Sequence, residues 1–498
     1  MLRAEQSSPA PHAVREGEQV KGVRSAAPFV FLALAFLLML LLQKSYLVQS
    51  DEGYTLNAAW QAWNGMKMYD DFRLFVAPGA AYAVVLAWKL TGGPSFLAAR
   101  VLSLLLAFSS IVAVYLILVR RGVRELGLAG AVAAWVVASA QYVMLNHNAF
   151  SSYAACWVLL LLLRAHERDR APDARRLADH AAVGVATGVV TLFLQTKGLL
   201  LLGAITVFTL LAVGGKRGVR AAVTLVASAA AVIAPLLLVW RPSVLVREWF
   251  VVPLTGDYLG HTGASRWLAG VCVLLVTAMA AIAWRLRDRL LVAIVVVQAA
   301  LLAGMLHNLE ARHVAVNAFP LLLFVPLALR AIADRRSPPA PPARGRPLSA
   351  GVMMAMIVGP WALLLATPAG RPMWKESALY VDFVRRPSRN IFPQPRVAAA
   401  HAIYAGPFMP GLYFALGKAN PFFVSETVVC DGVCQRRLIA QIQQVHPEIA
   451  FLDYDMIRHL HYDENNPVDA FFRDRYVACP RQDYEGLIVR AVDMGWCP

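Results

Sequence analysis

The stretch PFVFLALAFLLMLLLQKSYLV occupies residues Pro28–Val48 and is followed by the acidic pair Asp51 and Glu52. An α-helix needs about 20 mostly apolar residues to cross a bilayer, so this stretch predicts a first transmembrane helix. The rest of the chain has the same character, because 58% of its 498 residues are hydrophobic, 16% are charged and the mean hydropathy is +0.54. Its apolar residues come in blocks of helix length. The sequence therefore predicts an α-helical polytopic membrane protein.

Further apolar blocks extend this pattern to about eleven predicted transmembrane helices within residues 28–366. The predicted spans are residues 28–48, 97–119, 128–145, 149–163, 181–194, 199–213, 221–240, 267–284, 290–306, 314–329 and 348–366. The apolar block Leu74–Leu90 is expected to be an interfacial helix, because a crossing there would reverse the side of every later loop.

The net charge of +16 is concentrated in short loops between the spans. The clusters are Arg120, Arg121 and Arg124; Arg164, Arg168, Arg170, Arg175 and Arg176; Lys216, Arg217 and Arg220; Arg285, Arg287 and Arg289; and Arg330, Arg335, Arg336, Arg344 and Arg346. They fall at every second loop, and cytoplasmic loops are enriched in Lys and Arg. The sequence thus predicts a cell (inner) membrane protein whose N-terminal tail, 1–27, is cytoplasmic and whose first loop, 49–96, is external. The basic excess indicates topology and not nucleic-acid binding.

Residues 367–498 differ in composition and are predicted to form a small extracytoplasmic α/β domain. Segments 401–405 and 448–454 have strand patterns, and segments 435–445 and 468–476 have helix patterns. The four cysteines of this region are Cys430, Cys434, Cys479 and Cys497. In an oxidising compartment they predict two disulfides, and the short first spacing favours Cys430–Cys434 with Cys479–Cys497 among three pairings. A zinc site is the alternative.

Asp51 and Glu52 are the first candidates for a functional site. An acidic pair just past the C-terminus of a helix lies at the negative end of the helix dipole, where cations are favoured. Folding alone would then not require these carboxylates, which suggests a chemical role. The alternative is an acidic loop start exposed to solvent.

The segments Asp51–Tyr54, Asn57–Trp60, Tyr69–Phe72 and Pro78–Gly79 resemble the first external loop of GT-C glycosyltransferases. The branch that they resemble contains the protein O-mannosyltransferases and the lipid A aminoarabinose transferase. The resemblance continues in residues 97–100, 194–198 and 310–320. It implies a membrane enzyme that transfers a sugar from a polyprenyl-phosphate donor to an acceptor hydroxyl on the outer face, with inversion. The acceptor remains open and is a lipid, a glycan or a protein.

By this resemblance Asp51 is the catalytic base, with Glu52 as its neighbour or substitute. A carboxylate within hydrogen-bond reach can take the proton that the acceptor hydroxyl loses as it attacks the anomeric carbon. Magnesium or manganese binding to these two carboxylates is an open alternative. A hard cation requires more oxygen ligands than the sequence assigns, so the metal ligands stay unknown.

The departing phosphate needs positive charge, which points to Lys197, Arg312 and His313 as donor phosphate-binding residues. Alternatively, Lys197 extends to the membrane interface, and Glu310 pairs with Arg312 within a loop. Further residues are predicted to line the cavity. These are Tyr54, Tyr69, His147, Asp257, His261 and Glu310.

Two other classes of function remain open. A polytopic transporter or lipid flippase would also carry charges within its membrane part, although it would often show internal repeats. An assembly protein that displays its outer domain would explain the C-terminal region but not the acidic first loop.

Overall fold

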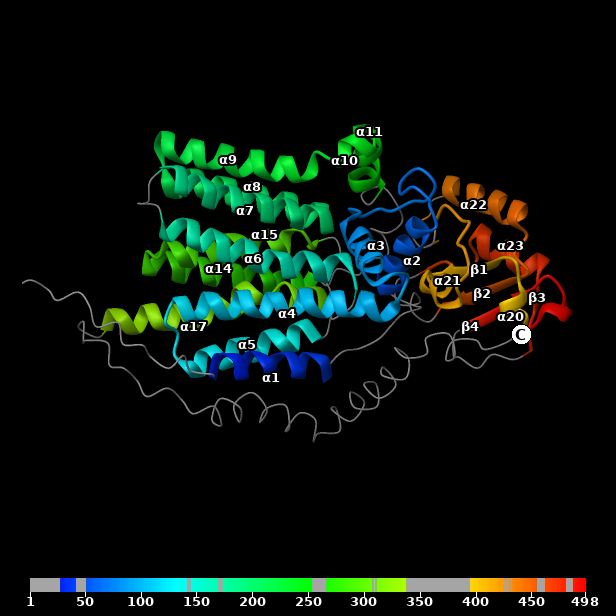
Figure 1. The fold of residues 1–498 in the computed structure, drawn as a ribbon, viewed down its shortest axis with the longest axis horizontal. Coiled ribbons are helices and arrows are strands. Elements are labelled where there is room, and N and C mark those ends of the chain that lie inside the picture. The colour runs from blue at the N-terminus through cyan, green and yellow to red at the C-terminus, as the bar shows by residue number, and fades with distance from the viewer. Residues whose placement is uncertain are drawn as a thin grey trace, which may run out of the picture.

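A computed structural model gives the fold of the chain. It describes residues 27–41, 51–140, 145–168, 173–252, 266–306, 309, 311–336, 395–424, 427, 430, 432–454, 462–480 and 487–498. The architecture is a large helical bundle joined to a smaller unit with a β-sheet (Figure 1). The predicted fold class is therefore confirmed.

Long apolar helices lie side by side in the bundle (Figure 1). They are α1 (Ala27–Leu41), α4 (Phe96–Arg120), α5 (Glu125–Ala140), α6 (His147–Glu167), α7 (Asp173–Phe193), α8 (Gln195–Val213), α9 (Gly215–Ile233), α14 (Arg266–Leu286), α15 (Arg289–Ala303) and α17 (Phe319–Arg336). Each corresponds to one of the first ten predicted spans. The predicted span 348–366 lies outside the described residues.

Within the described part of the chain, five helices are long and apolar enough to cross a membrane. They are Phe96–Arg120, His147–Glu167, Gln195–Val213, Gly215–Val239 and Trp267–Leu286. Their outward faces carry large apolar side chains, such as Leu211 and Trp284, which are 80% and 83% exposed. Contact of such side chains with lipid is favourable, whereas their exposure to water is not.

The basic loops gather at one end of the bundle. Side chains there join different basic segments through contacts of Arg330 with Gly122, Arg335 with Leu286, Arg289 with Ala212, and Arg121 with Glu167. Between α8 and α9 the chain reverses at Gly214 and Gly215, whose φ angles of +71° and +52° suit glycine. We call this end the basic end.

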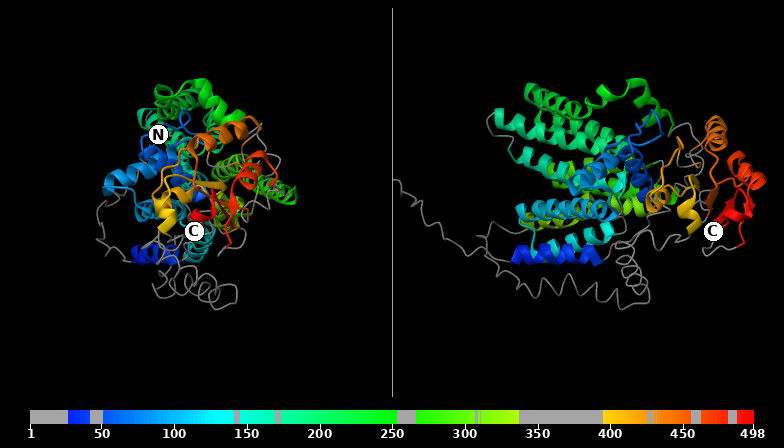
Figure 2. Two further views of the ribbon diagram at one scale, coloured as in Figure 1. Left: turned by 90° about the vertical axis from the view of Figure 1, so that its right-hand side faces the viewer. Right: turned by 45° about the vertical axis from the view of Figure 1, so that its right-hand side comes forward.

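The opposite end of the bundle carries α2 (Asp51–Trp63) and α3 (Gly79–Thr91), so we call it the α2 end (Figure 2). The helix α3 corresponds to the apolar block Leu74–Leu90, and its position at the membrane interface stays a prediction. A Cβ atom on Gly79 would lie 2.4 Å from the main-chain oxygen of Leu192, so only glycine allows α3 to approach α7 this closely. Shorter helices follow α9 and α15. These are α10 (Leu236–Val239), α11 (Pro242–Val246), a π-helix (Arg247–Val251) and α16 (Ala311–Val316).

The described residues between 395 and 498 form the C-terminal unit, with its own apolar core. The sheet has the order β1 (Ile403–Pro407), β2 (Ile449–Asp453), β4 (Leu487–Ala491) and β3 (Val477–Ala478). β1 runs parallel to β2, and the other neighbouring pairs are antiparallel. The helices are α20 (Pro395–Ala399), α21 (Gly411–Leu416), α22 (Gly432–Val445), α23 (Pro467–Arg475) and a 3₁₀ turn (Met494–Trp496).

The four predicted elements of this unit correspond to β1, β2, α22 and α23, whereas β3 and β4 were not predicted. Both predicted disulfides are present. Cys430 pairs with Cys434 and Cys479 pairs with Cys497, with Cα atoms 5.1 Å and 5.3 Å apart. These separations are normal for disulfides. The cysteines therefore brace the unit.

Candidate active site

Asp51 and Glu52 form the first turn of α2. The expectation that a helix dipole disfavours this acidic pair is therefore wrong, because the pair begins a helix. Acidic side chains are favoured at a helix N-terminus, where the dipole is positive. Helix formation alone thus explains part of their presence, and their chemical role has to be argued from their contacts.

Glu52 forms an ion pair with Arg100, which belongs to α4. Both side chains are buried, with 0% and 1% of their surface exposed. The Arg100 guanidinium donates a hydrogen bond to Glu52 Oε2 and lies 5.2 Å above the ring of Phe96. Glu52 is therefore held as the counter-ion of a buried cation.

Asp51 is partly buried and faces the start of α6. Asn146 donates a hydrogen bond from Nδ2 to Asp51 Oδ2, at 3.4 Å. The other amide atom of Asn146, Oδ1, accepts from the main-chain nitrogen of Ala149 at 2.7 Å and so caps α6. The same asparagine thus fixes the beginning of α6 and contacts the Asp51 carboxylate.

Lys197 lies in the first turn of α8, and its side chain is completely buried. Its ammonium group donates hydrogen bonds to the main-chain oxygen of Asn148, at 3.1 Å, and to Ser152 Oγ, at 2.9 Å. Gly304 makes room for it, because a Cβ atom there would lie 3.0 Å from Lys197 Cα. The alternative that Lys197 extends to the membrane interface is therefore wrong.

The turn Asn146-His147-Asn148 brings the carboxylate and the ammonium group together. Asn146 contacts Asp51, and two residues later the main-chain oxygen of Asn148 contacts Lys197. His147 itself is 7% exposed, and its Nε2 lies 3.3 Å from Asn148 Nδ2. One short turn thus separates an acidic from a basic side chain that are 146 positions apart in the sequence.

His313 is joined to the same network through Asn317. The main-chain oxygen of His313 accepts from Asn317 Nδ2 at 2.7 Å, and Ser152 Oγ lies 2.9 Å from Asn317 Oδ1. His313 is buried, with 3% of its surface exposed. Arg312 precedes it in α16. The predicted cavity residues Asp257, His261 and Glu310 lie outside the described residues.

Tyr54 and Tyr69 pack within the first loop region. Tyr54 is buried and stacks on Phe75, with ring centroids 5.2 Å apart. The hydroxyl of Tyr69 donates to the main-chain oxygen of Val76, at 2.6 Å, and accepts from Trp249 Nε1, at 2.9 Å. Burial raises the pKa of the Tyr69 phenol. Tyr69 therefore shapes the loop by hydrogen bonding.

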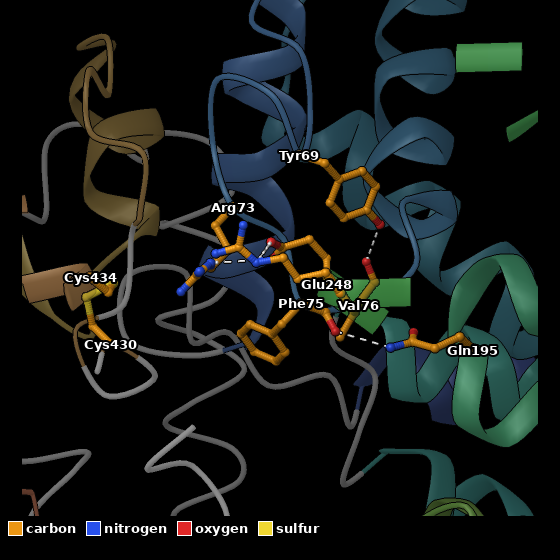
Figure 3. A network of polar contacts seen from close by, with 9 residues as sticks. Tyr69, Arg73, Phe75, Val76, Gln195, Glu248, Cys430 and Cys434 are labelled. Carbon is orange, nitrogen blue, oxygen red and sulfur yellow. Dashed lines mark hydrogen bonds and ion pairs between the residues drawn. A yellow bond between two sulfur atoms is a disulfide. The ribbon is translucent and has the colours of Figure 1, made fainter. Parts of the chain in front are cut away.

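Residues that were not predicted connect this loop to the rest of the protein (Figure 3). Gln195 accepts from Ala77 N at 2.8 Å and donates to the main-chain oxygens of Phe75 and Trp249, both at 3.1 Å. Only its place in segment 194–198 pointed to Gln195, and no role was assigned to it.

Glu248 is the second such residue, and it lies in the π-helix. Its carboxylate is 3.4 Å from Arg73 Nε and 3.8 Å from Arg247 Nε. Burial raises the pKa of Glu248, although Arg73 and Arg247 oppose that effect. No motif in the sequence marks Glu248.

The arrangement can remove a proton and stabilise an anion. The helices α2, α6 and α8 present their N-termini, which carry positive partial charge, in the region of Asp51, His147 and Lys197. Among the described residues, no group of three or more His, Cys, Asp or Glu side chains is placed to hold a metal ion.

No family model and no curated protein sequence matches the chain. Solved structures do match it. The apo structure of ArnT from Cupriavidus metallidurans has 16% sequence identity and a TM-score of 0.59, and the match covers 95% of this chain and 100% of that one. ArnT bound to undecaprenyl phosphate matches with the same identity and coverage and a TM-score of 0.53. An Archaeoglobus fulgidus oligosaccharyltransferase, tethered to an acceptor peptide, has 12% identity, a TM-score of 0.51 and coverage of 95% and 75%.

Proposed function

We propose that this chain, whose fold is that of the GT-C glycosyltransferases, is a membrane glycosyltransferase. It takes a sugar from a polyprenyl-phosphate donor and transfers it, with inversion, to an acceptor hydroxyl on the outer face of the membrane. The observation that carries this proposal is the turn Asn146-His147-Asn148, which contacts the Asp51 carboxylate on one side and the Lys197 ammonium group on the other.

Asp51 acts as the general base. Asp51 is partly exposed, whereas the Glu52 side chain is buried against Arg100. An acceptor hydroxyl next to Asp51 loses its proton to this carboxylate as the oxygen attacks the anomeric carbon. The bond from that carbon to the phosphate oxygen breaks at the same time, and attack from the opposite face inverts the configuration.

Lys197 stabilises the phosphate that leaves. A buried ammonium group interacts strongly with an anion because little water screens the interaction. The N-termini of α6 and α8 add positive partial charge, and His313, joined to Lys197 through Asn317 and Ser152, lines the same region. A leaving phosphate needs no proton from an acid, so these groups suffice for the departure.

Structural neighbours support a lipid-phosphate donor, since one of the ArnT structures is bound to undecaprenyl phosphate. They leave the acceptor open among a lipid, a glycan and a protein, because the archaeal neighbour carries an acceptor peptide. Asp51 and Glu52 fit a magnesium or manganese ion poorly, because Arg100 already engages Glu52.

The proposed orientation places the basic end of the bundle in the cytoplasm and the α2 end, with the C-terminal unit, outside the cell (inner) membrane. It follows from the excess of Lys and Arg in cytoplasmic loops. In this orientation Asp51, at the start of α2, lies toward the outer face, where a lipid-linked sugar meets its acceptor.

The test is Asp51→Asn, which removes the base and keeps the shape of the side chain. Membranes of the source cell supply acceptors, and polyprenyl phosphates that carry radiolabelled hexoses or pentoses supply donors. We expect transfer to fall by about a hundredfold to ten thousandfold, while binding of unglycosylated polyprenyl phosphate is retained. Asp70→Asn, an exposed carboxylate of the same loop, should keep wild-type transfer.

Other outcomes would redirect or reject the proposal. Loss of transfer in Glu52→Gln together with full activity in Asp51→Asn would move the base by one residue. Full activity in both variants would reject the proposal that the chain is a glycosyltransferase. Uptake of labelled lipid or sugar into sealed vesicles without transfer would favour a transporter or flippase.

A further inference from the structure

The end of α2 that is remote from Asp51 is built into the C-terminal unit. Phe414 of α21 stacks on Trp88 of α3, with ring centroids 5.3 Å apart and planes 7° from parallel. The same ring meets Trp60 of α2 edge-on, at 5.8 Å. Trp60 in turn donates its indole hydrogen to the main-chain oxygen of Lys418, at 2.8 Å. The C-terminal unit thus inserts an aromatic side chain between the two helices of the α2 end.

Buried amides join the same two parts. Gln61 Nε2 donates to the main-chain oxygens of Asn420, at 3.2 Å, and Phe422, at 3.3 Å. Asn420 Nδ2 donates to Asn57 Oδ1 at 3.3 Å. The exposed fractions of Asn57, Gln61 and Asn420 are 1%, 1% and 2%. We call these contacts of α2 and α3 with Phe414, Lys418, Asn420 and Phe422 the seam. A buried polar group that loses its hydrogen-bond partner is costly, so the seam allows few orientations of α2.

The seam and the candidate base lie on one short rigid element. Gln61 follows Asp51 by ten residues, which corresponds to about 15 Å along a helix. At the other end of α2, Glu52 is held by Arg100. α2 is therefore fixed at both ends, and each step of one residue around a helix turns a side chain by about 100°. A rotation of α2 would carry the Asp51 carboxylate away from Asn146.

We propose that the C-terminal unit is a positioning element of the active site. Through Phe414 and Asn420 it fixes the height and rotation of α2 and thereby holds the Asp51 carboxylate against the start of α6. This inference rests on the proposed function, in which Asp51 is the base. Phe414, Asn420 and Gln61 are then positioning residues that act on the reaction through α2 and touch neither substrate.

The expected effect is on turnover rather than on donor binding. A displacement of about 1 Å of a reacting group can cost about a hundredfold in rate, even when the substitution is remote. The donor phosphate site is built from α6, α8 and α16, and none of its described contacts involves the C-terminal unit. Loosening the seam should therefore lower kcat and leave donor affinity unchanged.

The decisive variant is Gln61→Glu in the full-length protein. It keeps the size of the side chain but turns a carboxylate oxygen toward the two main-chain oxygens of the seam. Asn64→Asp is the matched control, because Asn64 is exposed and its side-chain amide donates to the main-chain oxygen of Trp60, one helical turn earlier in α2. We expect kcat to fall at least tenfold in Gln61→Glu, with the Kd for unglycosylated polyprenyl phosphate within threefold of wild type. Asn64→Asp should match wild type in both.

Hydrogen exchange shows whether the variant has loosened α2, and amides of Asp51–Trp63 should exchange faster in Gln61→Glu. Faster exchange with unchanged kcat would overturn the inference. So would a parallel loss of kcat and phosphate binding, because that result indicates general damage. If Gln61→Glu does not accumulate, Phe414→Leu decides by the same criteria, since it removes the ring stacking and keeps an apolar side chain. Inactive Asp51→Asn beside active Gln61→Glu would reject this inference alone, whereas active Asp51→Asn would reject the proposed function.

Discussion

The ion pair of Glu52 and Arg100 should be essential to the fold of the α2 end, and Arg100→Leu tests this. Both side chains are at most 1% exposed. Removal of one partner from a buried pair leaves an uncompensated charge and typically costs about 3–5 kcal/mol. We expect a loss of that size in the free energy of unfolding, because Glu52 has little access to water that would replace the guanidinium.

The double variant Glu52→Gln/Arg100→Leu should recover part of the loss. It removes both charges, and the remaining buried amide costs about 1–3 kcal/mol if it lacks a partner. A matched control exists at the basic end, where Arg121 and Glu167 form an ion pair at 2.9 Å with 29% and 35% of their side chains exposed. Arg121→Leu should cost about 1 kcal/mol or less, because water and salt screen exposed pairs.

Unfolding of the purified protein in mixed micelles, with increasing fractions of a denaturing detergent, measures these differences. The reasoning is refuted if Arg100→Leu costs no more than Arg121→Leu. It is also refuted if the double variant is as unstable as Arg100→Leu, because Glu52 and Arg100 would then not be coupled. Either result would leave Glu52 available as a base, and the choice of Asp51 over Glu52 would lose its support from the burial of Glu52 against Arg100.

Other predictions concern separate parts of the chain. Lys197→Met should weaken binding of polyprenyl phosphate and lower sugar transfer, each by at least tenfold, in the binding and transfer assays described for Asp51→Asn; unchanged binding would remove Lys197 from the phosphate site. Burial raises the pKa of Asp469 from 3.8 to about 6. Protonation of Asp469 should therefore add about 3 kcal/mol to the free energy of unfolding below pH 4, and this contribution is lost as the pH rises through 6. Proteolysis of the C-terminal unit in the intact protein between pH 4 and 8 measures this, and Asp469→Asn should flatten the pH dependence. Cysteines introduced at Ser388 and Ser337 should be labelled from outside intact cells at the first site only; labelling at the second site only would reverse the proposed topology.

Hydropathy and charge predict most of the fold because they act locally along the chain. A bilayer requires about 20 apolar residues per helix wherever that helix packs, so ten described helices match predicted spans such as 97–119 and 267–284. The strands β1 and β2 were predicted because they are short apolar runs that are fully buried. β3 was missed because it has two residues, both exposed, and its pairing with β4 depends on the rest of the sheet.

The residue types of the candidate site follow from the sequence, but their contacts do not. Asp51 and Lys197 follow from a motif and from the cost of a cation within a membrane protein. Their shared neighbour is a polar turn at Asn146, which sequence pattern alone cannot distinguish from any other turn. Glu248 and the partner of Glu52 depend on which helices meet, and no local pattern contains that information. The wrong reason given for Asp51 has the same origin, since a helix that starts at residue 51 was not predicted.

The direction of the helices gives a physical reason for the proposed role of Lys197 in a chain with so many arginines. In a bundle of antiparallel neighbours every second helix begins at the same end, and α4, α6 and α8 all begin at the α2 end. Their N-termini give this end positive partial charge, which favours phosphate. Arginines such as Arg120 and Arg164 lie in the last turns of the same helices, at the basic end, where cations are favoured by the dipole. The requirements of topology and of the dipoles thus keep arginines such as Arg120 and Arg164 a bundle length away from the proposed phosphate site. A cation for catalysis therefore has to be placed separately, in the first turn of a helix and among hydrogen-bond acceptors, and Lys197 meets both conditions.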